Sequence, residues 1–275
     1  MKIGIDLGGT NMRVALIDGD TIKERIIKPC PAQAAEDVVT NQLINQIQEL
    51  MRPEVKGIGM GVPSIVDTER GIVYNVNNIP SWREVHLKEI LEQKFGVPAY
   101  IENDANTFAL GVYHFGEGRG TNNMVGLVMG TGIGSGIVIG GEMYHGMNAC
   151  AGEIGSLLFK DKDFEYYCSS RFFSLCHGDT GKNFGIRAQQ GDESALAVWR
   201  EFGQNVGELM KAIMFVYAPD AIVIGGGISS AFHYFESSMR DTIASFPFSS
   251  MVKETRIVPS TLQDAALLGA SALVK

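Results

Sequence analysis

The amino-acid sequence predicts an α/β fold made of two similar halves. Each half opens with three short strand-forming segments separated by turns, and each continues with alternating helices and apolar strands. Three glycine-rich turns close strand-forming runs: Asp6-Leu-Gly-Gly-Thr10, Gly130-Thr-Gly-Ile-Gly134 and Gly225-Gly-Gly227. Because the halves share the order of their elements, we infer a duplicated unit whose halves face each other across a cleft at the carboxyl ends of the strands.

The first half contains five expected strands and two expected helices. Asp18-Gly-Asp20 is typical of a hairpin turn, and apolar residues recur at helical spacing after residue 34 until Pro53 ends the helix. Gly96 ends the second helix. The expected strands are residues 2–7, 13–17, 21–28, 55–62 and 97–102, and the expected helices are residues 34–51 and 86–95.

The second half repeats this order. Residues 123–129 form an expected strand before the second glycine turn, residues 136–139 follow it, and Gly140-Gly141 turns into a third short strand. A long amphipathic helix is expected at residues 195–217 and ends at Ala218-Pro219-Asp220. A strand at residues 221–224 then runs into the third glycine turn.

Composition and charge exclude several classes of protein. The 275 residues carry a net charge of −8 and no run of Lys or Arg, so we expect no nucleic-acid partner. No apolar run approaches the roughly 20 residues of a membrane-spanning helix, and the first residues lead directly into a strand, so we expect no membrane and no signal peptide. Four cysteines without a CxxC pair fit a reducing compartment. We therefore expect a cytoplasmic protein.

The three glycine turns predict a nucleotide site. Glycine lacks a Cβ, so such turns expose backbone N–H groups to a bulky anion. Each turn alone is a weak signal, but three in order, the first with an acid and a threonine, indicate an ATP-using enzyme. A carboxylate at Asp6 would repel a triphosphate unless a cation lay between them, which predicts Mg²⁺ beside Asp6. The alternative is an acid that merely caps the Gly8-Gly9 turn.

Seven motifs, in order along almost the whole chain, resemble those of ROK-family sugar kinases. They are Asp6-Leu-Gly-Gly-Thr10, Gly61-Val-Pro-Ser64, Asn78-Ile-Pro-Ser-Trp82, Glu102-Asn-Asp-Ala-Asn106, Gly130-Thr-Gly-Ile-Gly134, Ala151-Gly-Glu-Ile-Gly155 and Gly225-Gly-Gly227. The resemblance implies the actin-like (ribonuclease H-like) ATPase fold, with a small domain of residues 1–104 and 264–275 and a large domain of residues 105–263. It also implies a C-terminal helix that packs on the small domain, and a homodimer that binds ATP and a sugar.

The resemblance implies that Asp104 is the catalytic base, because phosphoryl transfer needs a carboxylate that orients the attacking hydroxyl and accepts its proton. From residue types alone, Asn103 or Asp104 could instead cap a helix at residues 105–113. The family's Lys after Thr10 is Asn11 here, with Arg13 as the expected substitute. The residues implied for ATP are Asp6 (also for Mg²⁺), Gly8, Gly9, Thr10, Asn11, Arg13, Gly130, Thr131, Gly132, Gly225, Gly226 and Gly227, and those implied for the sugar are Ser64, Asn78, Asn103, Asp104 and Glu153.

One part of the family pattern is missing. Many members have a His after Gly-Glu-x-Gly and then a cysteine-rich segment, which together bind a structural zinc, and the segment ends in a Glu that contacts the sugar. This chain has Ser156 in place of the His, keeps only Cys168, and has Ser170 where that Glu would stand. Four tetrahedral ligands cannot be assembled, so we predict no zinc. Three nearby side chains could compensate for the lost sugar contacts: Glu165, His145 and His177.

The leading function is an ATP:hexose 6-phosphotransferase. A transcriptional regulator is one alternative, because the family includes sugar-responsive repressors. Those carry a helix-turn-helix domain ahead of the first phosphate loop, whereas here the loop begins at Asp6 in an acidic chain. A catalytically degenerate sugar sensor is the other. The missing zinc segment favours it, and the retained Asp104 and glycine turns oppose it. The sequence does not specify which sugar is used.

Overall fold

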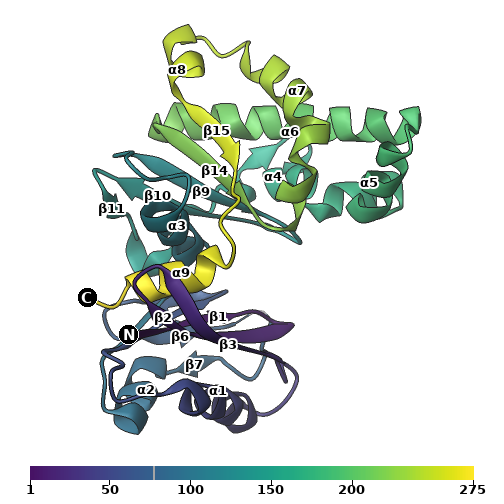
Figure 1. Cartoon of the computed structure of the whole chain (residues 1–275). Coiled ribbons are helices and arrows are strands. Elements are labelled where there is room, and N and C mark those ends of the chain that lie inside the picture. Colours follow the sequence, from purple (N-terminus) through teal and green to yellow (C-terminus); the bar gives the residue numbers. More distant parts are fainter. Residues whose placement is uncertain (77) are drawn as a thin grey trace.

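The computed structural model describes residues 1–76 and 78–275 of the chain. Each half of the molecule contains one five-stranded sheet, and two helices, α3 (Asp104–Phe115) and α9 (Ala265–Ala272), lie between the sheets (Figure 1). The strand orders are β3-β2-β1-β4-β8 and β11-β10-β9-β14-β15. In both sheets three antiparallel strands are followed by two parallel ones. The predicted duplication of an α/β unit is therefore confirmed.

The first sheet follows the sequence pattern closely, with differences at its ends. Its strands are β1 (Lys2–Leu7), β2 (Asn11–Asp18), β3 (Thr21–Pro29), β4 (Ile58–Val62) and β8 (Ala99–Asn103). The predicted strand at residues 55–62 was too long, because the N–H of Val55 donates to the carbonyl of Arg52 in a turn. The strand predicted at residues 97–102 begins later, after Pro98, which has no N–H to donate to a sheet, and it includes Asn103.

Two helices and a small sheet complete the N-terminal half. Helix α1 (Glu36–Leu50) packs on β2 and β3, and α2 (Leu87–Phe95) packs on β8 and ends at Gly96, which has φ +69°. Between β4 and α2 the chain forms a three-stranded sheet of β5 (Ile65–Asp67), β6 (Ile72–Tyr74) and β7 (Glu84–Val85). The sequence pattern missed this sheet, because strands of two or three residues are too short to display a period.

The second sheet carries most of the apolar core. Its strands are β9 (Met124–Met129), β10 (Ile133–Ile139), β11 (Glu142–Met143), β14 (Ala221–Gly225) and β15 (Arg256–Pro259). Strand β10 starts at Ile133, within the second glycine motif and earlier than the predicted residue 136, and β15 was not predicted. Helix α6 (Glu193–Tyr217) lies against α7 (Phe232–Ile243), and both contribute buried side chains to a core with β9 and β14.

The remaining elements of the C-terminal half are short and were not predicted. They are η1 (Met147–Ala149), η2 (Ile154–Ser156), β12 (Leu158–Phe159), β13 (Lys162–Asp163), α4 (Phe164–Cys168), the π-helix η3 (Phe172–Cys176), α5 (Gly181–Gln189), η4 (Gly227–Ala231) and α8 (Ser249–Glu254). Helices α4 and α5 both pack against α6.

Helices α3 and α9 pack against each other at very short range, and α3 also packs on strands of both sheets. A Cβ at Gly269 of α9 would lie 1.7 Å from the carbonyl oxygen of Thr107, and one at Gly111 of α3 would lie 1.9 Å from that of Ala265. Helix α9 also packs on β1 and β4 of the first sheet, where a Cβ at Gly59 would lie 1.8 Å from the carbonyl oxygen of Ala270. The expected packing of a C-terminal helix on the first half is therefore present, while the division into two domains at residues 104 and 264 stays a prediction.

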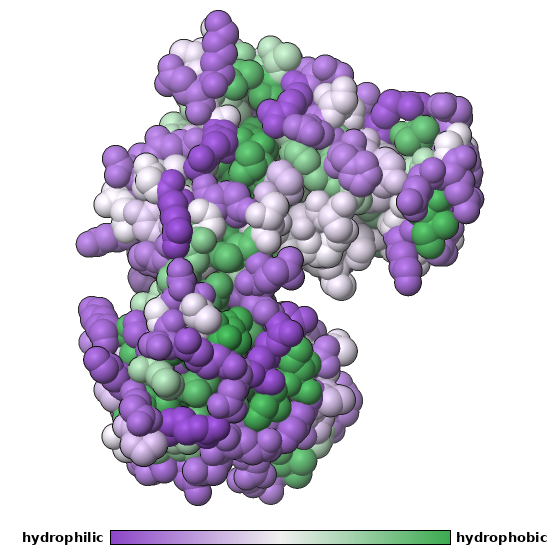
Figure 2. Space-filling view, in the orientation of Figure 1, coloured by the Kyte–Doolittle hydropathy of each residue, from purple (hydrophilic) through white to green (hydrophobic). Residues whose placement is uncertain are grey.

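The outer surface is mainly polar. Hydrophilic residues cover most of both halves in the view of Figure 2. Across residues 1–76 and 78–275, no helix combines the length and the apolar composition needed to cross a membrane.

Candidate active site

Three parallel strands of the first sheet end side by side. In their register Asp6 of β1 lies opposite Gly61 of β4, and Val62 lies opposite Asn103 of β8. The residues that follow these strand ends are therefore neighbours in space. This arrangement brings Asp6 and the Asn103-Asp104 pair to one edge of the sheet, the edge at which α/β folds commonly bind ligands.

Asp104 is the first residue of α3, and its neighbour Asn103 caps that helix. The Oδ1 of Asn103 accepts hydrogen bonds from the N–H groups of Ala105 (2.9 Å) and Asn106 (3.3 Å). Asp104 Oδ1 also accepts from the N–H of Ala105, at 2.9 Å. Of the two capping alternatives left open by the sequence, Asn103 is thus the main cap. One carboxylate oxygen of Asp104 has no hydrogen-bond partner among the residues that the structure describes.

The surroundings of Asp104 make it a stronger base than an ordinary aspartate. Burial, followed by the negative charges of Asp6 and Glu153, raises its pKa from 3.8 to about 6. These effects outweigh the hydrogen bond from Ala105, which lowers the pKa. A carboxylate with a raised pKa accepts a proton more readily, yet Asp104 remains mostly ionised at neutral pH.

Asp6 pairs with Arg13 on the neighbouring strand. The two residues are directly opposite in the β1–β2 register, and Arg13 Nη1 lies 3.2 Å from Asp6 Oδ2. Burial raises the pKa of Asp6, Arg13 lowers it, and Asp264 raises it further. Arg13, expected as a substitute for a phosphate-binding Lys, therefore already has a carboxylate partner.

The first glycine turn contacts a segment that the sequence predicted for sugar binding. A Cβ at Gly9 would lie 2.5 Å from Cβ of Asn78, so only glycine fits beside Asn78. Ser64, another predicted sugar residue, donates its hydroxyl to the carbonyl of Tyr74, and its own carbonyl accepts from Asn103 Nδ2 at 3.3 Å. The side chain of Ser64 is thus engaged within the protein, whereas Asn78 is exposed.

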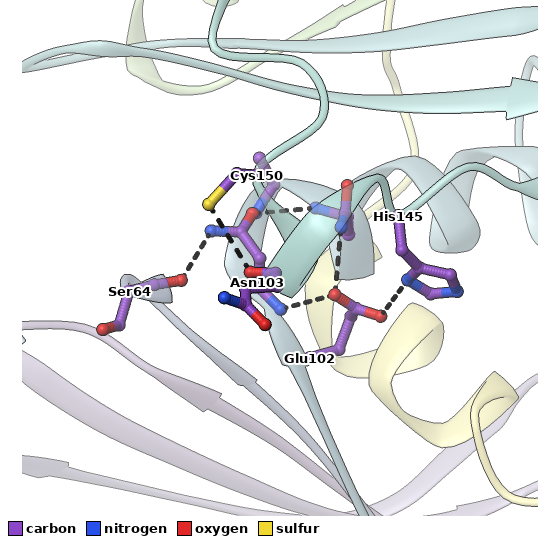
Figure 3. Close-up of polar contacts among 8 residues, drawn as sticks. Ser64, Glu102, Asn103, His145 and Cys150 are labelled. Atoms are coloured by element: carbon purple, nitrogen blue, oxygen red, sulfur yellow. Dashed lines mark hydrogen bonds and ion pairs between the residues drawn. The ribbon is translucent and has the colours of Figure 1, made fainter. Parts of the chain in front are cut away.

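A buried glutamate organises the turn that carries Asp104. Glu102 is 1% exposed, and its Oε1 accepts from the N–H of Asn103 (2.8 Å) and from Nδ2 of Asn106 (2.9 Å). Its other oxygen, Oε2, lies 2.9 Å from Nδ1 of His145, a residue of the C-terminal half. Figure 3 shows the Glu102 carboxylate between Asn103 and His145. The sequence had offered His145 only as a possible sugar contact.

The second glycine turn connects β9 to β10 and is held by the segment that follows Glu153. The N–H of Ser170 donates to the carbonyl of Gly130 at 2.8 Å. Glu165 of α4 accepts from the N–H of Ile133 at 3.0 Å, and it forms an ion pair with Arg171 at 2.9 Å. A carboxylate therefore lies directly beside this turn, while Thr131 at its tip is exposed.

The charge of Glu165 acts on Glu153. Loss of hydration, followed by the charge of Glu165, raises the pKa of Glu153. The preceding residue is fixed to β10, because Ser135 Oγ donates to the carbonyl of Gly152 at 2.6 Å. Since Glu153 also raises the pKa of Asp104, the carboxylates of Asp6, Asp104, Glu153 and Glu165 form one electrostatically linked group between the two sheets.

The third glycine turn adjoins the second, because β14 pairs with β9 and Gly225 lies opposite Val128. A Cβ at Gly225 would lie 2.3 Å from the ring of Phe108, and one at Gly226, where φ is +82°, would lie 2.3 Å from the carbonyl oxygen of Met129. A Cβ at Gly227 would meet no atom within 4 Å. The protein's own packing therefore requires the first two glycines, and only Gly227 faces open space.

The sequence offered Glu165 only as one of three possible compensating side chains, and the structure places it beside the second glycine turn. Glu165 precedes Cys168 by one helical turn, so its position beside the second glycine turn depends on how α4 packs, which no local pattern reveals. His177, the third candidate, faces Glu201 at 3.4 Å and packs against Phe172.

Cys168 is buried, which raises the pKa of its thiol, and Ser156 is exposed. In residues 1–76 and 78–275, no three His, Cys, Asp or Glu side chains converge to hold a metal ion; the absence of zinc stays a prediction.

Comparisons with known proteins extend over the whole chain. A model of the ROK family matches residues 2–275. The glucokinase of Thermotoga maritima is 29% identical over 306 aligned positions, which cover 99% of this chain and 96% of that enzyme. The xylose repressor of Bacillus subtilis is 26% identical, over 99% of this chain and 76% of the repressor.

A solved structure supports the same relationship. A ROK family glucokinase from Streptomyces griseus, crystallised in complex with glucose and AMPPNP, matches with a TM-score of 0.82 and 25% identity, over 99% of this chain and 98% of that chain. The structural neighbours share the actin-like ATPase fold of sugar kinases. The fold expected from the motifs is therefore confirmed.

Proposed function

We propose, from the premise that this chain belongs to the ROK family, that it is an ATP-dependent kinase that phosphorylates the 6-hydroxyl of a hexose or hexose derivative. Sugar kinases are prominent among its relatives, which supports the general activity. Beyond this general activity, we also propose that the substrate is a hexose, that its 6-hydroxyl is phosphorylated, and which residues take part.

The environment of Asp104 is the observation that carries this proposal. Its carboxylate stands at the end of β8, close to the charges of Asp6 and Glu153, with a pKa raised to about 6. A base with a pKa just below the working pH is ionised and can still accept a proton in the transition state. We propose that Asp104 orients the attacking sugar hydroxyl and removes its proton as the γ-phosphoryl group is transferred.

Amide and carboxylate side chains around Asp104 suit a polyol. Each can pair with two neighbouring hydroxyl groups. Asn103 retains one amide hydrogen beyond its bond to Ser64, Asn78 is exposed beside the first glycine turn, and Glu153 lies near Asp104. We propose that these three residues bind the sugar and that Glu165 joins them, through its position near Glu153.

We propose that the glycine turns bind ATP. The second and third turns lie next to each other at the ends of β9 and β14, where backbone N–H groups can face phosphate oxygens. In this proposal Thr131 donates its hydroxyl to a phosphate and Gly227 leaves room for the adenosine.

A magnesium ion is part of the proposal, with Asp6 as its protein ligand. Mg²⁺ commonly binds through one or two carboxylates together with substrate phosphates, so a converging set of three side chains is not required. Asp6 fits this role because its side chain is 19% exposed and has a second oxygen free of Arg13. When bound with ATP, Mg²⁺ would neutralise charge on the phosphoryl oxygens.

A coupled assay of ADP release over a panel of monosaccharides tests the proposal. We expect ATP consumption that depends on one hexose or N-acetylhexosamine, with the phosphate located by ³¹P NMR at the 6-position. The Asp104→Asn variant, purified in parallel, controls for contaminating kinases. A wild-type protein that consumes no ATP with any sugar, or that phosphorylates a different hydroxyl, would contradict the proposal.

A regulatory role is the second candidate, because the xylose repressor of Bacillus subtilis matches nearly the whole chain. A sugar sensor without catalysis would bind a sugar in titration calorimetry and leave ATP unchanged.

We also propose that the protein is a homodimer. Light scattering in solution tests this, and it should give twice the mass of one chain.

A further inference from the structure

A loop of the C-terminal half reaches the N-terminal half beside Asp104. We call residues 144–152 the bridging loop. Both of its ends are fixed to β10, since the N–H of Tyr144 donates to the carbonyl of Ile137 at 2.7 Å and Ser135 Oγ donates to that of Gly152 at 2.6 Å. The N–H of Ala151 donates to the carbonyl of His145 at 3.1 Å, which closes the loop on itself.

One residue of the bridging loop, Ala149, is buried in the N-terminal half. Ala149 is 5% exposed and belongs to the core cluster of the first sheet, and η1 contacts β5. Asn148 and Ala149 have φ of +53° and +56°, conformations that non-glycine residues adopt at a cost of roughly 1–3 kcal/mol each. Such strain persists only where the surrounding contacts hold the chain in place, so this contact between the halves is specific.

His145 supplies the polar part of that contact. Its Nδ1 lies 2.9 Å from Oε2 of Glu102, and hydrogen bonding to Glu102 raises the pKa of the imidazole. Glu102 is 1% exposed, and a buried carboxylate is costly unless it is paired. His145 therefore supplies the partner that this buried carboxylate requires.

Glu102 in turn fixes the turn that carries Asp104. Its Oε1 accepts from the N–H of Asn103 and from the side chain of Asn106, one residue before and two residues after Asp104. The loop that brings Glu153 to the site and the turn that brings Asp104 are thus joined through one pair of side chains (Figure 3).

We propose that His145 is a positioning residue: through Glu102 it aligns Asn103 and Asp104 with Glu153 across the two halves of the molecule. The inference rests on the proposed function, because it concerns the geometry of the same sugar site. His145 itself does not act on the substrate; it holds the residues that do.

Kinetics of matched variants test this role. We expect His145→Ala to raise the KM for the sugar by about tenfold or more and to lower kcat, because a displaced catalytic group costs up to about a hundredfold in rate. The KM for ATP should change less than twofold, since the glycine turns do not contact His145. His145→Asn, whose amide stands near the place of Nδ1, should recover most of the lost activity. His233→Ala, a change at an exposed histidine of α7, is the matched control.

A double-mutant cycle separates the pair from two independent effects. Glu102→Gln and His145→Ala should be non-additive, so that the double variant is no worse than the more damaged single variant. Equal increases in both KM values, additive losses, or an inactive His145→Asn that behaves as His145→Ala would overturn the proposal.

Hydrogen exchange gives a readout that needs no activity. Amides 103–106 and amides 144–152 should both exchange faster in each single variant, although the two segments are about 40 residues apart in sequence. If the wild-type protein phosphorylates no sugar but this coupled change appears, the proposed function fails and the coupling stands. If sugar is phosphorylated and only the altered segment itself responds, the positioning role is wrong.

Discussion

The two five-stranded sheets have the same topology but offer different chemistry at their strand ends. In the first sheet the parallel strands β1, β4 and β8 end near carboxylate and amide side chains, among them Asp6, Asn103 and Asp104. In the second sheet the equivalent ends of β9 and β14 are glycine turns whose exposed groups are mostly backbone. The same topology thus presents polar side chains at the strand ends of the first sheet and backbone N–H groups at those of the second.

This difference follows from what each partner needs. A sugar is recognised by hydroxyl groups, which require directional side chains, while a polyphosphate requires a close approach of several N–H groups. We therefore expect substitutions at Asn103 and Asp104, at the end of β8, to act on the sugar and on chemistry, and those at the glycine turns of the second sheet to act on ATP. The following predictions test this division, from the largest expected effect to the smallest.

Asp104→Asn should have the largest effect, a loss in kcat on the order of 10²–10⁴-fold with sugar affinity nearly unchanged, because the variant keeps the size and one acceptor oxygen but cannot accept the proton. Stopped assays and titration calorimetry with the sugar measure the two quantities. An equal loss of sugar binding would mean that Asp104 is structural.

The same variant should be more stable than the wild type at neutral pH. Because the pKa of Asp104 rises from 3.8 to about 6 on folding, its ionisation disfavours the folded state above pH 6, and this penalty disappears as the pH falls below 3.8. Partial exposure reduces the gain to about 1 kcal/mol, or about 2–4 °C in Tm. Thermal unfolding at pH 7.5 and at pH 4 measures it, and a gain of equal size at both values would contradict this cause.

Gly226→Ala should be damaging on the second sheet, with Gly227→Ala as its matched control. The first change places a Cβ 2.3 Å from the carbonyl oxygen of Met129 at a residue with φ +82°, whereas the second meets no protein atom within 4 Å. We expect Gly226→Ala to lower the free energy of unfolding by about 1–3 kcal/mol and to weaken ATP binding, both measured by unfolding with and without ATP. Weaker binding of ATP by Gly227→Ala without loss of stability would place the nucleotide against Gly227; an unchanged Gly226→Ala variant would contradict the packing argument.

The pH dependence of kcat/KM should show a single acidic limb. The base must be ionised, so the rate should fall about tenfold per pH unit below the Asp104 pKa of about 6. A slope steeper than one would reveal that Glu153, whose pKa is also raised, must be ionised too. A flat profile between pH 5 and 8 would exclude Asp104 as the base.

Glu165→Gln should have the smallest effect, a rise of about three- to tenfold in the sugar KM with kcat nearly constant. The amide oxygen can still accept from the N–H of Ile133, but the charge near Glu153 is removed. Glu254→Gln, on the exposed face of α8, is the control. A change in the KM for ATP alone would assign Glu165 to the second glycine turn and not to the sugar.

The sequence revealed those parts of the fold that local patterns encode. Apolar strands that end in glycine turns, and a helix with a 25-residue amphipathic pattern such as α6, show a period or a turn residue that depends only on neighbours. The short strands β5 to β7 show no such period, and the residues of β15 pair with β14 residues that lie 35 positions earlier in the chain. These elements exist because of tertiary pairing.

The residues of the site also differ in whether a local sequence pattern could predict them. Asp104 was predicted from a motif in which it directly follows Asn103, so its chemistry and its neighbours are adjacent in the sequence. The partnership of Glu102 with His145 and that of Glu165 with Ile133 join residues more than 30 positions apart. A single sequence contains no signal for such pairs, which depend on how β11 and α4 are packed.

The position of α9 has a consequence for the order in which this chain can fold. The glycines Gly4 and Gly59 leave a flat area on the first sheet that fits only the backbone of a helix, yet that helix comes from residues 265–272. An N-terminal fragment emerging from the ribosome therefore cannot complete this side of its sheet. Strands β1 and β4 therefore reach their full stability only after α9, which is close to the C-terminus, has been synthesised.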